Sequence, residues 1–292
     1  MTNLIEFYNR FNDEQTCRDY LEKARWGDEI ICPHCGIIGN AYKYKDGRLF
    51  KCKDCRKQFT VRVGTIFEDS KLPLQKWFLA IYLATSLKKG ISSIQLSKYL
   101  GITQKTAWFM LHRIRYAVET SSYDKPLDGD VEMDETYVGG KTTMKKKFDN
   151  KTPVVGAVER KGRVVAKVTD DASATTLQRV IRERVSVGAN LYTDDWKGYH
   201  RASRLVFMHR AVNHSKKQWA IGQAHTNTIE GFWSHLKRGI DGIYHHVSSK
   251  HLQRYCDEYQ YRYNTRDMTD GERFNDYFAN IHGRLEYKEL LA

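Results

Sequence analysis

Three acidic residues, Asp134, Asp194 and Glu230, lie in sequence contexts that point to one shared chemistry. Asp134 lies in a β-rich run, Asp194 closes the apolar run 190–193, and Glu230 lies on an amphipathic helix; 35 residues (195–229) separate the last two acids. Three carboxylates that converge in space can hold two divalent cations, which can activate water and stabilise a leaving oxygen in phosphodiester cleavage. The three acids therefore predict a metal-dependent site for phosphoryl transfer.

The segments around these acids carry a specific resemblance. They read MDETYVGGK (133–141), YTDDWKGY (192–199) and HTNTIEGFWSHLKRGI (225–240). Together they resemble the DDE transposases of bacterial insertion sequences, in the branch that begins with a zinc ribbon, and the resemblance covers nearly the whole chain. It implies a protein of the bacterial cytoplasm and nucleoid that binds the ends of its element, cleaves DNA and joins the 3′-hydroxyls to target DNA. Asp134, Asp194 and Glu230 would be catalytic and would hold two Mg²⁺ or Mn²⁺ ions, in a DNA-assembled homodimer or higher oligomer.

Each acid has a competitor close by. Asp134 and Glu135 are adjacent on a strand, so their side chains face opposite ways and only one can enter the site; the resemblance favours Asp134. Asp194 and Asp195 are also adjacent, and the resemblance favours the first. Asn227 is the rival of Glu230, and we prefer Glu230 because a carboxylate binds a hard cation better than an amide.

Other polar residues near Glu230 have possible roles. Lys237 lies two helical turns after Glu230, where it could bind a DNA phosphate beside the metals. His214 and His225 flank the site in sequence and could either orient substrate or satisfy core hydrogen bonds. The five lysines of the loop 141–151 could contact the phosphates of the donor or target DNA backbone. The alternative is a solvated loop, which is the usual structure of a lysine-rich run.

Two CxxC pairs, Cys32–Cys35 and Cys52–Cys55, are separated by 16 residues (36–51). Such spacing suits tetrahedral thiolate coordination of one structural zinc ion. The residues between them alternate around Asp46-Gly47, which predicts a β-hairpin, and two cysteine turns joined by a hairpin describe a zinc ribbon. His34 is left out because four cysteines already complete the shell. Cys17 and Cys256 have no CxxC partner and are expected to be buried thiols.

A helical segment follows the ribbon. Residues 75–87 are predicted to form one helix, and the apolar pattern of 92–115, interrupted at Gly101, predicts a helix-turn-helix. Thr103 would cap its second helix, which presents residues able to reach base edges or phosphates at its start: Gln104, Lys105, Thr106 and Trp108. This segment is the predicted DNA-binding element, and the ligand would be the end of the insertion sequence.

From about residue 130 the pattern changes to strands. Runs at 131–137, 153–159 and 163–169, a helix capped by Ser173, a fourth strand at 190–193 and later helices follow the order of a ribonuclease H-like domain. The predicted fold class is α/β, with this mixed sheet and its helices preceded by the ribbon and the helix-turn-helix. Three domains are expected: an N-terminal helix with the zinc ribbon (1–67), the helix-turn-helix DNA-binding segment (68–125) and the ribonuclease H-like catalytic domain (126–292). The helix at 250–266 is rich in tyrosine and arginine, and its tyrosines are expected to pack rather than stack on bases.

The composition fits a protein that acts on nucleic acid. The formal net charge of +13 and the pI near 9.3 favour a polyanionic partner. No run of about 18 apolar residues predicts a membrane span, and no signal-peptide pattern is present at the start. The alternative is a DNA-binding regulator derived from a transposase, and intact acids at all three positions count against it. A ribonuclease or resolvase on the same fold is disfavoured by the dedicated DNA-reading segment.

Overall fold

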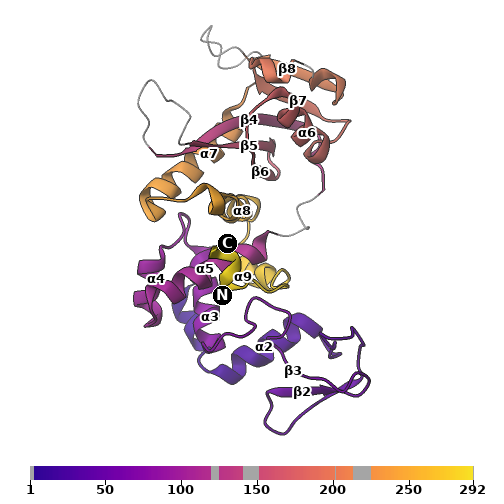
Figure 1. Cartoon of the computed structure of the whole chain (residues 1–292), viewed down its shortest axis with the longest axis vertical. Helices are drawn as coiled ribbons and strands as arrows, with labels where there is room; N and C mark the ends of the chain where they lie inside the picture. The colour runs from indigo at the N-terminus through magenta and orange to yellow at the C-terminus, as the bar shows by residue number, and fades with distance from the viewer. Residues whose placement is uncertain (1–2, 120–124, 141–150, 201, 213–224, 292) are drawn as a thin grey trace. The chain divides into compact units, whose positions relative to one another are not determined.

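The computed structural model describes residues 3–119, 125–140, 151–200, 202–212 and 225–291 (Figure 1). The chain divides into two compact units. Unit 1 combines Met1–Val118 with Met268–Ala292, and unit 2 is Glu119–Asp267. Residues 268–292, which the sequence analysis assigned to the catalytic domain, thus group with the N-terminal unit. No helix within the described ranges is long and apolar enough to cross a membrane.

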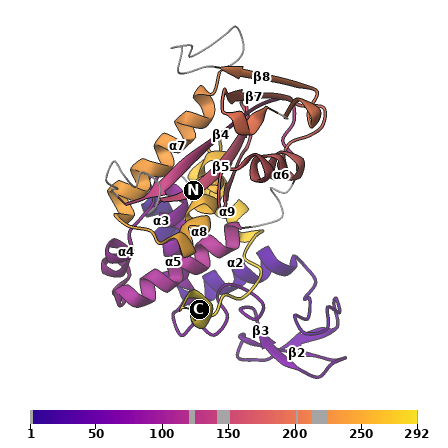
Figure 2. The same cartoon turned by 45° about the horizontal axis from the view of Figure 1, so that its top comes forward.

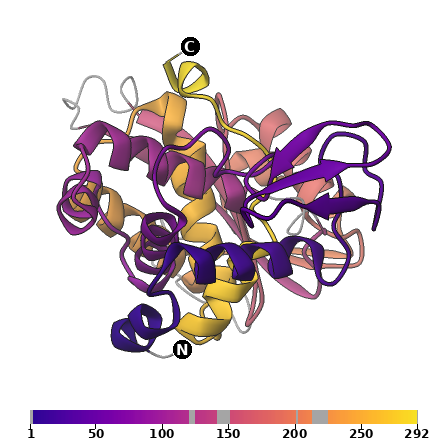
Figure 3. The ribbon, with the colours of Figure 1, turned by 90° about the horizontal axis from the view of Figure 1, so that it is seen from below.

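Unit 1 begins with two helices and a small sheet. Helices α1 (Leu4–Arg10) and α2 (Glu14–Trp26) precede the antiparallel strands β1 (Ala41–Lys43), β2 (Leu49–Cys52) and β3 (Gln58–Thr60). The predicted hairpin is confirmed: β1 pairs with β2, and the Asp46 carboxylate accepts the N–H groups of Arg48 and Leu49 in the turn. Trp26 at the end of α2 packs on Phe50, with ring centroids 5.1 Å apart, which holds α2 beside the sheet (Figure 3).

The rest of unit 1 is helical. It consists of α3 (Leu74–Ser86), α4 (Ser93–Leu100), α5 (Gln104–Val118), α9 (Asp270–Phe278) and α10 (Tyr287–Leu291). Helices α4 and α5 form the predicted helix-turn-helix: Gly101 adopts the left-handed conformation that ends α4 (φ 57°), and the Thr103 hydroxyl accepts the Thr106 N–H. An aromatic core explains why α9 belongs here, because Phe274 and Phe278 pack on Phe78 of α3 with centroids 5.9 and 4.8 Å apart.

Unit 2 is built on a five-stranded sheet in the order β6-β5-β4-β7-β8. The strands are β4 (Asp130–Gly139), β5 (Lys151–Glu159), β6 (Val164–Val168), β7 (Asn190–Asp194) and β8 (Met208–Val212). The first three pair antiparallel, whereas β7 and β8 run parallel to β4. This order and these directions are those of a ribonuclease H-like domain, as predicted, although the sequence analysis did not identify β8.

Helices cover both faces of this sheet (Figure 2). On one face, α6 (Ala174–Arg184), capped by Ser173 as predicted, packs Leu177, Val180 and Ile181 against Val131 and Met133 of β4. On the other face lie α7 (Asn227–Gly239), a π-helical turn η6 (Ile240–Tyr244) and α8 (Ser249–Asn264). Two short 3₁₀ turns, η3 (Lys197–Tyr199) and η4 (Ala202–Arg204), connect β7 to β8.

Helix α8 covers the outer edge of β6 with amide side chains. Gln253, Gln260 and Asn264 accept the N–H groups of the β6 residues Val168, Ala166 and Val164 at 2.8, 3.0 and 2.7 Å. An unpaired strand edge is a site for unwanted pairing, and these amides occupy it. The α8 residues Tyr255, Tyr259 and Tyr261 are buried, in agreement with the packing role predicted for them.

Replacing Gln260 tests this edge cover. Gln260→Leu should lower the free energy of unfolding by about 1–3 kcal/mol, because the buried Ala166 N–H loses its acceptor. Lys250→Leu, at an exposed position of the same helix, should change it by less than about 0.5 kcal/mol. Urea denaturation followed by circular dichroism measures both; equal effects would mean that Gln260 does not serve the edge.

Candidate active site and cysteine cluster

Asp134 and Asp194 come from neighbouring parallel strands. Asp134 lies within β4, and Asp194 is the last residue of β7. The two strands pair with Val131 opposite Leu191 and Glu132 opposite Tyr192. Continuing this register by two residues places Asp134 beside Asp194. Because strand side chains alternate between faces, both acids share the face of Glu132, which contacts α7.

The Asp134 carboxyl group is held by a tryptophan and crowded by other acids. The Trp233 indole N–H of α7 donates to Asp134 Oδ2 at 3.1 Å. Burial raises the pKa of Asp134 to about 7, and the negative charges of Glu135, Asp194 and Glu230 add to this rise. Asp134 therefore lies within electrostatic range of both Asp194 and Glu230.

A glycine makes the tryptophan contact possible. Gly156 of β5 lies directly opposite Asp134 in the antiparallel pair. A Cβ atom at Gly156 would lie 2.5 Å from Cη2 and Cζ2 of Trp233, so the indole ring rests on bare backbone. This close approach brings the indole N–H to the level of Asp134.

Glu135 faces the other side of the sheet, as the alternation of strand side chains predicts. Its carboxylate accepts a hydrogen bond at 2.9 Å from the hydroxyl of Tyr199, a buried residue packed with the α6 face. Burial raises the pKa of Glu135, while the Tyr199 hydrogen bond opposes the rise. Glu135 is thus engaged away from Trp233 and α7.

Asp194 and Asp195 differ in their surroundings. Asp194 is half-buried, and its Oδ1 accepts the backbone N–H of Trp196 at 3.1 Å, which closes the turn after β7. Asp195 is exposed beyond the end of the strand. The strand register and the interaction with Asp134 both favour Asp194.

The third acid lies in the first turn of α7. Glu230 is exposed, and its Oε1 accepts a hydrogen bond at 2.8 Å from the hydroxyl of Thr226, the residue that precedes the helix. Its negative charge raises the pKa of Asp134. Asn227, its rival, is exposed at the first position of the same helix.

Lys237 lies within electrostatic range of Asp134. Desolvation lowers the pKa of Lys237, and the negative charge of Asp134 opposes this lowering.

The three acids do not form a closed ligand shell. Within the described ranges, one group of three or more Cys, His, Asp or Glu residues brings its ligand atoms within 4.8 Å of one another, and that group is the four cysteines. The fold therefore brings the acids into electrostatic range of Asp134 but leaves them farther apart than bound ligands.

The sequence analysis missed a fourth carboxylate, Glu132. Its side chain is fully buried; Oε2 accepts the N–H groups of Thr228 and Ile229 at 2.7 and 3.2 Å, and Oε1 accepts from Arg160 Nε at 2.8 Å. The alternation of β4 was the available signal, because it places Glu132 on the same covered face as Asp134. His225 Nδ1 lies 3.1 Å from Glu132 Oε1 but makes no hydrogen bond with it, so the contact is an ion pair only when the imidazole is protonated. His214 and the loop 141–150 lie outside the described residues.

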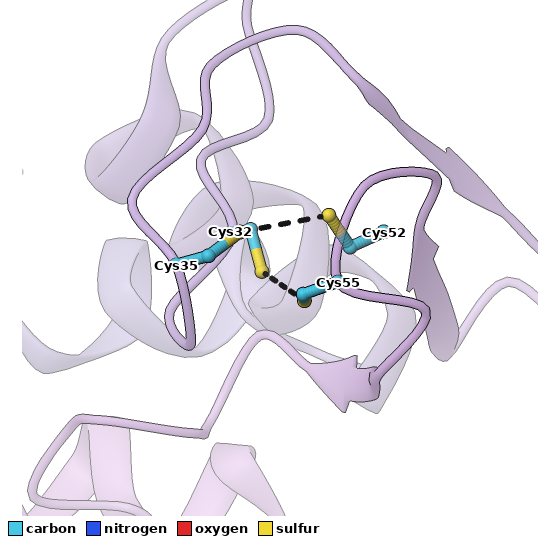
Figure 4. A group of neighbouring side chains, drawn as sticks. All are labelled: Cys32, Cys35, Cys52 and Cys55. Atoms are coloured by element: carbon cyan, nitrogen blue, oxygen red, sulfur yellow. Dashed lines mark hydrogen bonds between the residues drawn. The ribbon is translucent and has the colours of Figure 1, made fainter.

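The four cysteines form a compact cluster (Figure 4). Their Sγ atoms lie within 4.8 Å of one another, with 3.7 Å between Cys32 and Cys55 and between Cys35 and Cys52. A tetrahedron with Zn–S bonds of about 2.3 Å has sulfur–sulfur edges of about 3.8 Å, so the cluster has the size of a zinc site. The remaining cysteines, Cys17 and Cys256, are buried, as expected.

The predicted DNA-reading residues lie at the start of α5. Gln104 and Lys105 are exposed; the Gln104 amide donates to Ser93 Oγ at 2.9 Å, and the Lys105 ammonium lies 4.8 Å from the ring centroid of Tyr287 in α10. Thr106 is hydrogen-bonded to Thr103 at the helix start. The C-terminal helix thus contributes an aromatic ring beside this surface.

Comparison with known proteins identifies two domains. Residues 126–264 match the ISXO2-like transposase domain, and residues 12–58 match the transposase zinc-ribbon domain. An uncharacterized protein in the transposable element ISH50 of Halobacterium salinarum is 27% identical over 275 residues, covering 86% of this chain and 91% of the relative. An uncharacterized transposase-like protein of Haemophilus influenzae is 29% identical over 108 residues, covering 37% of this chain and 86% of the relative.

Among solved structures, the catalytic core domain of the HTLV-2 integrase in complex with magnesium aligns with 47% of this chain and 84% of its own, at 11% identity and a TM-score of 0.28. The zinc-ribbon match contains the cysteine cluster, and the ISXO2-like match contains the three acids.

The glycine beneath Trp233 can be tested directly. Gly156→Ala should destabilise the protein by about 1–3 kcal/mol, because the new methyl group overlaps the indole ring and forces it to move. Gly231→Ala in α7 is the matched control: its Cβ meets nothing within 4 Å, and alanine should be neutral or stabilise by up to about 1 kcal/mol. Thermal and urea denaturation would contradict the packing if Gly156→Ala unfolds like the wild type.

Proposed function

We propose that this chain, which matches a transposase zinc-ribbon domain and the ISXO2-like transposase domain, is a transposase that binds the ends of its insertion sequence and catalyses metal-dependent DNA cleavage and strand transfer. The observation that carries this proposal is geometric: the strand register places Asp134 beside Asp194 on the sheet face covered by α7, the helix that bears Glu230. Burial and, after it, the neighbouring carboxylates raise the pKa of Asp134, and a bound cation would offset the repulsion among these carboxylates.

The donor set suits divalent cations. Three carboxylates are hard oxygen ligands of the kind that Mg²⁺ and Mn²⁺ prefer. Two such ions supply the polarisation that activates the attacking hydroxyl and stabilises the leaving oxygen. Asp134, Asp194 and Glu230 are the residues that would hold them. Trp233 keeps the Asp134 carboxylate aimed at α7 through its indole N–H.

Other residues of the chain bind and orient the DNA. Lys237, within electrostatic range of Asp134, would bind a phosphate next to the reacting bond. Gln104, Lys105 and Thr106 at the start of α5 would contact the end of the element in a major groove. The net charge of +13 supports this assignment, since backbone phosphates provide much of the affinity. The active assembly would be a homodimer or a higher oligomer on DNA.

The cysteine cluster is assigned one structural zinc ion per chain. Four thiolates complete a tetrahedral shell and leave no open position for catalysis. The cluster joins the turn at Cys32–Cys35 to the β2–β3 turn at Cys52–Cys55, so the ion would hold the small sheet together. The zinc site thus serves the DNA-binding unit rather than the chemical step.

The zinc assignment predicts metal-dependent folding of the ribbon. Purified protein should contain one zinc per chain by elemental analysis, and Cys52→Ser should unfold the N-terminal module and weaken end binding, because the binding energy of such ions is folding energy. Cys17→Ser, outside the cluster, should retain the metal. A native protein without zinc, with four reactive thiols and an intact ribbon, would contradict the assignment.

The acid assignment predicts separable defects. Replacing Asp134, Asp194 or Glu230 with Ala should abolish Mg²⁺-dependent cleavage and strand transfer, because each loss leaves a cation under-coordinated. Binding of end DNA in a gel-shift assay should persist, since the helix-turn-helix and ribbon are unchanged. The controls are Glu135→Gln, which keeps an acceptor for Tyr199, and the exposed Asp195→Ala; both should retain most of the activity.

A direct comparison assigns the third ligand. In a strand-transfer assay, Glu230→Ala should be inactive and Asn227→Ala active, because the anionic side chain binds the cation more strongly than the amide. Activity in the Glu230 variant with loss in the Asn227 variant would reverse this assignment.

A further inference from the structure

One buried network connects the three elements that carry the acids. Its members lie two residues before each acid: Glu132 before Asp134, Tyr192 before Asp194, and Thr228 before Glu230. We propose that Glu132 and Arg160 form a clamp that positions the three acids relative to one another. The inference deepens the proposed function and rests on it, since it names the residues that set the geometry of that site.

The first half of the clamp is the contact between Glu132 and the start of α7. The first N–H groups of a helix have no partner within the helix, and the residue before α7, Thr226, makes no side-chain cap. Glu132 takes that place from a strand 96 residues away: it accepts the N–H groups of Thr228 and Ile229 and the hydroxyl of Thr228. A carboxylate at a helix N-terminus also interacts favourably with the helix dipole.

The second half of the clamp is Arg160, which directly follows β5. Its Nε donates to Glu132 at 2.8 Å, and a terminal nitrogen donates to the His225 carbonyl oxygen at 3.1 Å, just before α7. Its guanidinium group lies 4.2 Å from the ring centroid of Tyr192 on β7. One side chain therefore joins β4, β7 and the entry to α7, and it supplies the positive charge that a fully buried carboxylate requires.

The chain segments between the clamp residues and the acids are short and belong to regular secondary structure. Two residues of strand span about 7 Å, and two residues of helix rise about 3 Å. Neither stretch contains a loop that could absorb a shift, so a displacement at the clamp passes to Asp134 and Glu230. Glu132 and Arg160 are positioning residues by this argument, because they act on the acids through the backbone.

The experiment uses full-length protein with Glu132→Gln and Arg160→Lys. Glutamine keeps the volume but replaces one acceptor oxygen with a donor, and lysine keeps the charge but cannot join Glu132, His225 and Tyr192 at once. Glu159→Gln is the matched control: this acid also accepts backbone N–H groups and an arginine, but its bonds go to Asp128 and Arg163 and none of them reaches α7.

Two readouts test the clamp. In hydrogen exchange without metal or DNA, the peptide covering residues 226–236 should exchange about tenfold faster or more in both clamp variants, because charge-assisted bonds at the helix start are lost. In cleavage assays on end DNA, the Mg²⁺ concentration for half-maximal rate should rise about 10–100-fold, the usual effect of losing a residue that orients ligands. Glu159→Gln should change neither quantity.

The outcomes separate this inference from the function. Unchanged exchange and unchanged Mg²⁺ dependence in Arg160→Lys would overturn the clamp, even if Glu132→Gln fails to fold. Faster exchange with the wild-type Mg²⁺ dependence would leave Glu132 and Arg160 a purely structural role and would also overturn the clamp. Asp134→Ala in the same assay reports on the function: retained Mg²⁺-dependent cleavage there would refute the proposed function, whatever the exchange data show.

Discussion

A carboxylate without access to water must be surrounded by hydrogen-bond donors and positive charge, and this requirement organises unit 2 around Glu132. The side chain is fully buried in the face of β4 that α7 covers. Its donors come from the first turn of α7 and from Arg160 after β5. The hydrogen bonds that the Glu132 carboxylate requires therefore fix the position of the first turn of α7, which lies 96 residues later in the chain.

Trp233 and Gly156 provide a second connection between α7 and the sheet. Glu132 holds the first turn of the helix, and Trp233, one turn farther along, rests on the bare backbone of Gly156 and donates to Asp134. Two contacts along one helix fix both its position and its rotation about its axis. Glu230 lies between them in sequence, so its place near Asp134 follows from contacts that it does not make itself. The polar clamp and the packed indole are thus complementary parts of one arrangement.

The features that the sequence predicted are local in origin. The cysteine spacing, the Asp46-Gly47 turn, the Ser173 cap and the break at Gly101 each depend on residues close together in the chain, and each could be predicted from them. For Glu132, the alternation of β4 could indicate the covered face, but its partners could not be predicted, because they lie 28 and 96 residues away in sequence. The same reason applies to residues 268–292: Phe274 and Phe278 belong to unit 1 through ring contacts with Phe78, almost 200 residues earlier.

The acids also interact electrostatically. Burial raises the pKa of Asp134, and the charges of Glu135, Asp194 and Glu230 add to the rise, so bringing these carboxylates closer without a cation would increase the repulsion among them. The clamp and Trp233 act on backbone and ring positions, which bring the acids near one another but do not close them into a shell. Glu230 is exposed, and its carboxylate accepts a hydrogen bond from Thr226 at the start of α7. In the proposed reaction, Asp134, Asp194 and Glu230 would hold the cation, whose positive charge would offset the repulsion among their carboxylates, while the clamp and Trp233 position the elements that carry them.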